Sequence, residues 1–132
     1  MNELNEISIG GDGGQIQNPV FGPDSTLIVY ADQIVHGIEV NGTLSGNSNA
    51  PKAFEISSFT GSIKLLAVSA GTSQTEPHNC IEYLEFEFEG TNYKAGNVLD
   101  SSTLVSFSQG LYLSWSNLCS GSWIDRLIFN YI

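Results

Sequence analysis

Positive charge is what this 132-residue chain has least of, because 4 Lys and Arg stand against 14 Asp and Glu, for a formal net charge of −10. A chain this acidic cannot neutralise a phosphate backbone, so nucleic acid is excluded as a partner. The same shortage disfavours anionic membrane surfaces. No apolar run approaches about 18 residues and no basic-then-apolar leader is visible, so we expect neither a membrane span nor a signal peptide.

Cysteine and histidine are also scarce. Cys80 and Cys119 lack metal-site spacing, and His36 and His78 are too few and too scattered for a zinc set. We therefore expect no metal and no cofactor, and both histidines as loop or turn residues. The cysteines leave two alternatives open: one disulfide, or two separate small buried residues. A disulfide and the low lysine content would lean toward an extracellular setting, but the compartment is not readable.

Helical patterns are missing as well, since no window of about twelve residues combines an apolar stripe with caps. Apolar and polar residues alternate instead, as in strands with one buried face. The predicted strands are Leu27–Tyr30, Phe54–Ile56, Ile63–Val68, Ile81–Phe88, Leu104–Phe107, Leu111–Trp115 and Leu127–Tyr131. With 14 Gly available for turns, the chain is predicted to be all-β, as one domain over residues 1–132.

Three segments repeat one pattern, in the order apolar, polar, any, apolar, any, apolar. They are Val35–Val40, Ile81–Phe86 and Ile124–Phe129, about 45 residues apart. The first two are each followed by a turn and then by Gly46-Asn47 or Gly96-Asn97.

The third segment has no such tail, because the chain stops at Ile132. Its tail is found at the other end, as Ile7–Ile9 followed by the glycine loop Gly10–Gly14. We therefore expect the N-terminal strand to complete the third unit, which places the glycine loop beside Trp123 and Asp125. A repeat of this length holds about four short strands. Three four-stranded antiparallel sheets around a shared apolar axis follow, an arrangement that leaves few exposed edges.

The stretch Gly121–Asp125 holds the candidate binding residues. Residues two apart in an extended segment point the same way, so Trp123 and Asp125 share one side of a strand start. A flat ring beside a carboxylate suits a polyhydroxylated ligand. The structural alternative is a Gly-Ser turn, a half-buried Trp and a solvated Asp.

These features resemble the jacalin-related lectin family, which has the β-prism I fold of three Greek-key sheets with pseudo-threefold symmetry. Gly10–Gly14 is similar to the family's GGxGG loop, Gly121–Asp125 fits its GxxxD loop, and Ile124–Ile132 resembles its closing strand. The threefold repeat is similar to that of family members with three sugar sites.

The resemblance implies one sugar site. Asp125 would accept hydrogen bonds from two neighbouring sugar hydroxyls, while the backbone N–H groups of Ser122, Trp123 and Gly14 would donate to sugar oxygens. Gly121 opens the loop, and Trp123 would add an apolar wall. Gly13 and Asp12 are weaker candidates in the facing loop. The partners implied are mono- or oligosaccharides and glycoproteins, and family members commonly form homo-oligomers.

The other two copies depart from the motif. His36 and Glu82 stand where Asp125 stands, and both copies lack the opening glycine. We expect them to be structural repeats without sugar sites, although Glu82 is still a carboxylate with a longer arm. The segment 71–78 lengthens the loop before Glu82 and could cover a neighbouring surface. Asn41-Gly42-Thr43 matches a glycosylation sequon but is first of all a hairpin turn.

Three functions remain in view: a lectin, a glycan-processing enzyme that uses Asp125, and a β-prism without a ligand. A glycosidase needs a second carboxyl group, and Asp12 lies in a glycine loop without the apolar surroundings that a general acid requires. No Ser-His-Asp or Cys-His arrangement is present in a convincing context. We favour a lectin that is not an enzyme. Galactose preference in the family goes with a chain cleaved before the glycine loop, so the continuous chain here implies mannose or glucose.

Overall fold

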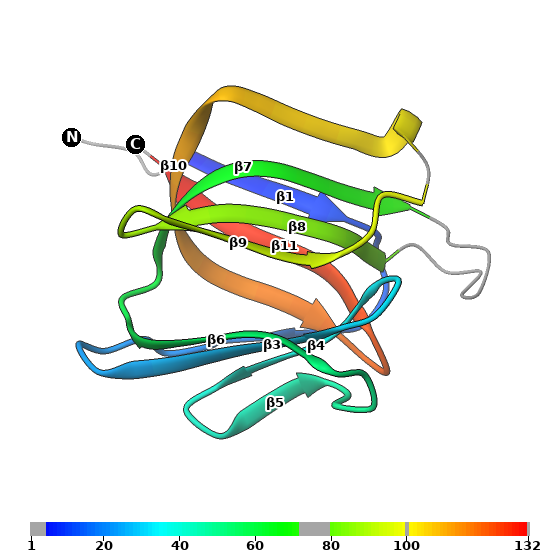
Figure 1. Cartoon of the computed structure of the whole chain (residues 1–132). Coiled ribbons are helices and arrows are strands. Elements are labelled where there is room, and N and C mark those ends of the chain that lie inside the picture. Colours follow the sequence, from blue (N-terminus) through cyan, green and yellow to red (C-terminus); the bar gives the residue numbers. More distant parts are fainter. Residues whose placement is uncertain (1–4, 72–79, 100, 132) are drawn as a thin grey trace.

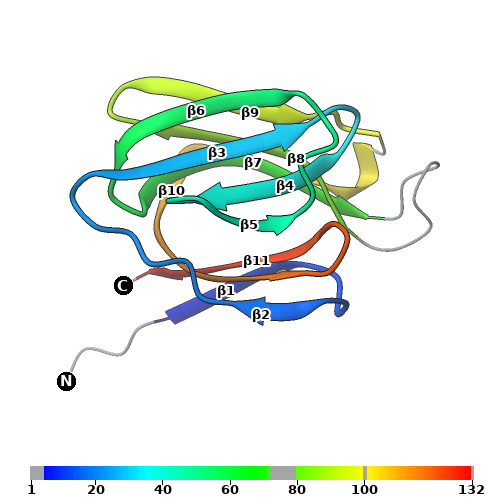
Figure 2. The ribbon, with the colours of Figure 1, turned by 90° about the horizontal axis from the view of Figure 1, so that it is seen from below.

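Three β-sheet faces surround the core of the computed structural model, which describes residues 5–71, 80–99 and 101–131 (Figures 1 and 2). Hydrogen bonds join the strands into one four-stranded sheet and one seven-stranded sheet, and the larger sheet bends into two faces at β10. Among the described residues there is no helix long and apolar enough to cross a bilayer.

The first face is a Greek key with strand order β5-β4-β3-β6. Its strands are β3 (Ser25–Ala31), β4 (Val35–Val40), β5 (Thr43–Gly46) and β6 (Lys52–Phe59). Alternate residues of β3 are fully buried, as the period-two pattern predicts. Figure 2 shows this face in front of the other two.

The second face repeats this order as β9-β8-β7-β10. Its strands are β7 (Ser62–Gly71), β8 (Cys80–Phe88), β9 (Thr91–Gly96) and the first part of β10 (Leu104–Ser120). A short 3₁₀ helix, η1 (Ser101–Thr103), precedes β10. In β8 the acids Glu85 and Glu87 alternate with buried Leu84, Phe86 and Phe88, as predicted.

Both ends of the chain build the third face. Its strands are β1 (Asn5–Gly10), β2 (Gln15–Gln17), β11 (Ile124–Tyr131) and the last part of β10. β1 pairs with β11 from Asn5↔Tyr131 to Gly10↔Arg126, and β2 pairs with the end of β10. The prediction that the N-terminal strand completes the C-terminal sheet is confirmed, and with it the prism of three Greek-key sheets.

Strand β10 corrects one prediction. Leu104–Phe107 and Leu111–Trp115 were expected to be separate strands, but they belong to one strand of 17 residues. Its pairing with β7 shifts register between Ser106 and Leu111, and Gly110 has φ +72° there. A bulge of this kind interrupts the alternation without ending the strand, because it bends the backbone while pairing resumes beyond it.

One aromatic ring from each face meets the others near the prism axis. Phe59 comes from the first face, Phe86 from the second and Trp115 from the third, and their ring centroids lie 6.1 to 6.3 Å apart. All three side chains are buried. Truncating a buried aromatic residue to alanine lowers the free energy of unfolding by about 3–5 kcal/mol, so the packing of these three rings contributes strongly to holding the faces together.

The repeat seen in the sequence is a repeat of backbone geometry. In each unit a glycine with positive φ packs against the carbonyl of the unit's polar position, and the next residue donates a backbone hydrogen bond to that carbonyl. The three bonds are Asn47 N–H to His36 O (3.1 Å), Asn97 N–H to Glu82 O (3.2 Å) and Gly11 N–H to Asp125 O (2.8 Å). We call these places the first corner (Asp32–His36 with Gly46-Asn47), the second corner (Cys80–Glu82 with Gly96-Asn97) and the third corner (Gly121–Asp125 with Gly10–Gly14).

Histidine and cysteine differ partly from expectation. His36 lies in strand β4 and is buried, so its prediction as a loop or turn residue is wrong. The repeat itself puts a strand residue there. Cys80 and Cys119 are held as buried thiols, not as a disulfide, which is the second of the two alternatives. His78, and residues 72–78 of the lengthened loop, lie outside the described residues.

The Asn41-Gly42 pair forms the β4–β5 hairpin turn, as expected, with φ values of +51° and +87°. The Asn41 side chain is occupied within the fold, since its Oδ1 accepts from Thr26 N–H (2.9 Å) and its Nδ2 donates to Ser25 Oγ (3.1 Å). The sequon thus serves as a turn.

A pair of glycines tests the repeated geometry. A Cβ at Gly96 would overlap the backbone carbonyl of Glu82, and φ is +79°. We expect Gly96→Ala to lower the free energy of unfolding by about 3 kcal/mol, since steric overlap adds to the cost of left-handed backbone. Gly90 has φ +83° and no atom within 4 Å of the place that an alanine methyl group would take, so it is the matched control. Gly90→Ala should cost only about 1 kcal/mol in urea denaturation. Equal losses for the two variants would contradict the close-packing argument.

Candidate functional site

The third corner joins the two ends of the chain. The loop Gly11–Gly14 leaves β1 beside β11 and enters β2 beside β10, so it crosses the β10–β11 turn at 121–123. The backbone N–H of Gly11 donates to Asp125 O at 2.8 Å. The glycine loop therefore lies beside the Trp123–Asp125 stretch, as the offset repeat predicts.

Asp125 lies against the glycine loop. A methyl group placed on Gly13 would lie 3.1 Å from Asp125 Oδ1, and one on Gly14 would lie 2.5 Å from Oδ2. Gly14 also has φ +77°, a backbone conformation that favours glycine. The Asp125 side chain is thus held in a corner, with the residue only 9% exposed, and both carboxylate oxygens face backbone that carries no side chains.

The turn before Asp125 presents backbone at the surface. Gly121 and Ser122 are exposed and Trp123 is half-buried, and Gly121 N–H donates to Trp123 O at 3.2 Å. The Trp123 ring meets the His36 ring edge-on, with centroids 4.5 Å apart and planes at 69°. Trp123 is therefore fixed against the first corner.

Asp12 stands apart from this group. Its side chain is fully exposed, and its Oδ1 lies 3.8 Å from Arg126 Nη1. Arg126 also donates from Nη2 to the Cys119 sulfur at 3.2 Å, a hydrogen bond that raises the pKa of Arg126. Arg126 follows Asp125 in β11, so the two side chains point to opposite faces of the sheet. The structure brings Gly13, Gly14, Ser122, Trp123 and Asp125 together and leaves Asp12 at the rim.

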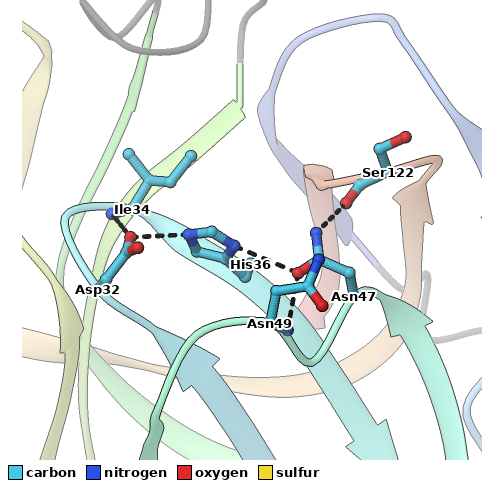
Figure 3. Close-up of polar contacts among 6 residues, drawn as sticks. All are labelled: Asp32, Ile34, His36, Asn47, Asn49 and Ser122. Carbon is cyan, nitrogen blue, oxygen red and sulfur yellow. Dashed lines mark hydrogen bonds and ion pairs between the residues drawn. The ribbon is translucent and has the colours of Figure 1, made fainter.

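At the first corner the same positions hold a closed polar network (Figure 3). Asp32, which aligns with Gly121, lies 2.7 Å from Nε2 of His36, which aligns with Asp125. Nδ1 of His36 lies 3.2 Å from Oδ1 of Asn47. The backbone turns match, since Asp32 N–H donates to Ile34 O as Gly121 N–H does to Trp123 O. The His36 ring bonds to both oxygens at once when both ring nitrogens carry a proton.

The carboxylate of Asp32 is stabilised in its charged form. Partial burial, the largest single effect, raises its pKa, but the hydrogen bonds from the Ile34 and Gln33 N–H groups and the bond and charge of His36 together lower that pKa below its ordinary value. These partners occupy the first corner from within, which fits its prediction as a structural repeat.

At the second corner Glu82 points into the protein. The residue is 0% exposed, and its Oε2 accepts from Ser69 Oγ at 3.3 Å. The Ser69 hydroxyl also bonds Thr103 Oγ1 at 2.5 Å. Glu82 therefore turns inward and does not reproduce the geometry of Asp125.

Two features escaped prediction from the sequence. Asn47 Nδ2 donates to Ser122 O at 2.6 Å, and the His36 ring contacts Trp123, so the first corner touches the third. The sequence feature that could have pointed to Asn47 is its position directly after Gly46, because Asn97 follows Gly96 and Gly11 follows Gly10 in the same way. That alignment predicts the backbone position but not the side-chain contact.

Shape alone does not single out the third corner. A cavity of about 380 Å³ lies elsewhere, between the β2–β3 connection and the β4–β5 hairpin, and is lined by Gln17, Asn18, Pro19, Val20, Val40, Asn41, Thr43 and Ser45. It contains no charged side chain. Within the part of the chain that the structure describes, no cluster of three or more His, Cys, Asp or Glu residues could hold a metal ion.

Acid titration tests the Asp32–His36 pair. Because the folded pKa of Asp32 is below its ordinary value of 3.8, its stabilising contribution is present above that value and is lost as pH falls through the lowered pKa. Wild type should be more stable than Asp32→Asn at neutral pH by up to about 1 kcal/mol, since half the side chain is solvent-screened. Urea denaturation between about pH 6 and pH 2 should show this gap closing. A gap that is independent of pH would contradict the assignment.

Solved structures with the same arrangement are known, although no protein-family model and no curated protein sequence matches the chain. A point variant of Malaysian banana lectin superposes with TM-score 0.69 at 16% identity, covering 99% of both chains. AcmJRL, a mannose-binding jacalin-related lectin from Ananas comosus, gives 0.65 at 14% identity over 96% of both. The second β-prism domain of RbmC from V. cholerae, solved with N-acetylglucosaminyl-β-1,2-mannose, gives 0.65 at 16% identity over 95% of this chain and 98% of that one. The chain has the β-prism fold of these jacalin-related lectins.

Proposed function

We propose that this protein is a lectin that binds carbohydrate at the third corner and has no catalytic activity. The observation that carries the proposal is the placement of Asp125. Of the three equivalent positions, this is the one where a carboxylate lies against a glycine loop: Asp125 Oδ1 lies beside Gly13 and Oδ2 beside Gly14, whereas His36 contacts Asp32 and Asn47, and Glu82 turns inward to Ser69.

The chemistry of the corner suits a sugar. A fixed carboxylate accepts hydrogen bonds from two adjacent hydroxyl groups, and charge-assisted bonds of this kind are the stronger ones. The backbone N–H groups of Ser122, Trp123 and Gly14 supply donors, and glycine lets a ligand approach them closely. Because the corner is held by β-strands on both sides, little ordering entropy is lost on binding.

Structural neighbours support the same class of ligand. One is described as mannose-binding, and another was solved with a mannose-containing disaccharide. The enzyme alternative has weaker support, because Asp12, the second carboxylate near the corner, is fully exposed at the rim beside Arg126. A glycosidase requires two carboxyl groups that flank the scissile bond.

A single shallow site binds weakly. A few hydrogen bonds and one ring give a dissociation constant on the order of millimolar for a monosaccharide, about −4 kcal/mol. Useful avidity then requires several sites on one assembly or repeated epitopes on the glycan. We propose mono- and oligosaccharides of glycoproteins as partners, bound through assemblies of several copies of the chain.

Asp125→Asn tests the site. The amide keeps the shape of the carboxylate but replaces one acceptor by a donor, so we expect glycan-array signal to fall at least about tenfold. Asp12→Asn is the matched control at the rim and should retain most of the signal. Thermal unfolding should show both variants folded. Undiminished binding by Asp125→Asn would rule out this site, release of sugar from a bound glycan would indicate an enzyme, and a silent wild type would indicate a prism without a sugar ligand.

The type of sugar is tested by competition. The chain runs without interruption from β1 into Gly11–Gly14, and Gly11 N–H is bonded to Asp125 O. The family resemblance links galactose preference to a chain cleaved before the glycine loop, so we expect methyl α-mannoside to inhibit glycan binding at lower concentration than galactose. Stronger inhibition by galactose would contradict the mannose or glucose assignment.

A further inference from the structure

A residue of another repeat forms a hydrogen bond to the backbone of the third corner. Asn47, which follows β5 at the first corner, donates from Nδ2 to the backbone carbonyl of Ser122 at 2.6 Å (Figure 3). The two residues are 75 positions apart in sequence. Ser122 is an exposed residue of a short turn, so this side-chain contact ties the turn to the neighbouring face.

The contact controls one peptide group of the proposed site. The Ser122 carbonyl and the Trp123 N–H belong to the same planar peptide, and the described residues contain no cis peptide. In a trans peptide the C=O and N–H bonds point in opposite directions. A hydrogen bond that holds Ser122 O toward Asn47 therefore directs the Trp123 N–H away from Asn47.

We propose that Asn47 is a positioning residue that aims the Trp123 N–H at the bound sugar. This rests on the proposed function, in which that N–H is a donor to a sugar oxygen. Asn47 itself does not touch the sugar. Its role is to remove the rotational freedom of the 122–123 peptide before the ligand arrives, so that the donor is already oriented.

The Asn47 amide is itself fixed. Its Oδ1 accepts from Asn49 N–H at 3.0 Å and contacts His36 Nδ1 at 3.2 Å, which leaves Nδ2 toward Ser122. His36 is held in turn by Asp32 and lies edge-on against the Trp123 ring. Two contacts from the first corner therefore hold consecutive residues of the sugar-binding turn, one on its backbone and one on its ring.

The pseudo-symmetry supplies a matched control. Asn97 occupies the equivalent place at the second corner, and its backbone N–H donates to the carbonyl of Gln33, the residue that aligns with Ser122. In each case the residue after a glycine holds the turn of the next unit. Asn97 acts there through its main chain and on a turn that carries no proposed sugar site, so Asn97→Asp makes the same chemical change without touching the third corner.

The test is Asn47→Asp. The substitution keeps the shape and the acceptor for Asn49 N–H and His36, but it removes the donor to Ser122 O and sets two oxygens against each other. By calorimetric or NMR titration with methyl α-mannoside we expect about tenfold weaker binding, the loss typical of one misdirected hydrogen bond. The thermal midpoint should stay close to wild type, and Asn97→Asp should bind as wild type does.

Two NMR readouts of the Trp123 amide separate positioning from general stability. Its signal should shift in Asn47→Asp and not in Asn97→Asp. In wild type, methyl α-mannoside should slow hydrogen exchange at this amide, which tests the donor role even if Asn47→Asp fails to fold. An exchange rate unchanged by sugar overturns the proposal.

The remaining outcomes are distinct. If Asn47→Asp binds as wild type while Asp125→Asn does not, the lectin function stands and the positioning role is overturned. If Asn97→Asp weakens binding equally, the effect is one of added negative charge, and the positioning role is again overturned. If wild type binds no glycan on an array, the proposed function fails, and this proposal fails with it.

Discussion

The antiparallel ladder between β1 and β11 is the interaction on which the third face depends. It joins residues from opposite ends of the chain, from Asn5↔Tyr131 to Gly10↔Arg126, whereas the first face is built from consecutive strands. Closing so long a loop costs entropy before any contact repays it. Without this ladder the glycine loop would not lie opposite Asp125, and the candidate sugar site would lack one of its two sides. The candidate site thus lies in the part of the prism with the longest-range pairing.

The three corners have the same backbone geometry and differ in the side chain at the polar position. At each, a left-handed glycine packs on the carbonyl of the unit's polar position, and a Cβ there would overlap backbone. That constraint fixes the main chain but leaves the polar side chain free to vary. His36 closes a network with Asp32 and Asn47, Glu82 turns inward to Ser69, and Asp125 faces the loop Gly13-Gly14. Geometry that is equivalent in the backbone therefore yields one candidate binding site and two structural corners.

Much of this was predictable because it is local or repeated. Period-two alternation gave the strands, and the offset repeat placed the N-terminal strand beside β11 without any contact information. Predictions failed where one residue was considered apart from the repeat or where a bulge broke the alternation. His36 was expected in a turn although its repeat position is a strand, and β10 was divided at the bulge before Leu111. The bond from Asn47 to Ser122 was out of reach for another reason, since side-chain contacts between units follow from packing and leave no periodic signal.

Weak sugar sites depend strongly on preorganisation, which gives the first corner a part to play. A ligand held by a few hydrogen bonds near −4 kcal/mol can lose much of its affinity to about 1 kcal/mol of ordering in the turn that binds it. The turn 121–123 is short and exposed, and its own Gly121–Trp123 bond is long at 3.2 Å. Asn47 and His36 contact this turn from the first corner, Asn47 at the Ser122 carbonyl and His36 at the Trp123 ring. In the proposed lectin, polar groups that bind no sugar themselves would therefore contribute to affinity, because the network of the first corner fixes the side chains that contact the third.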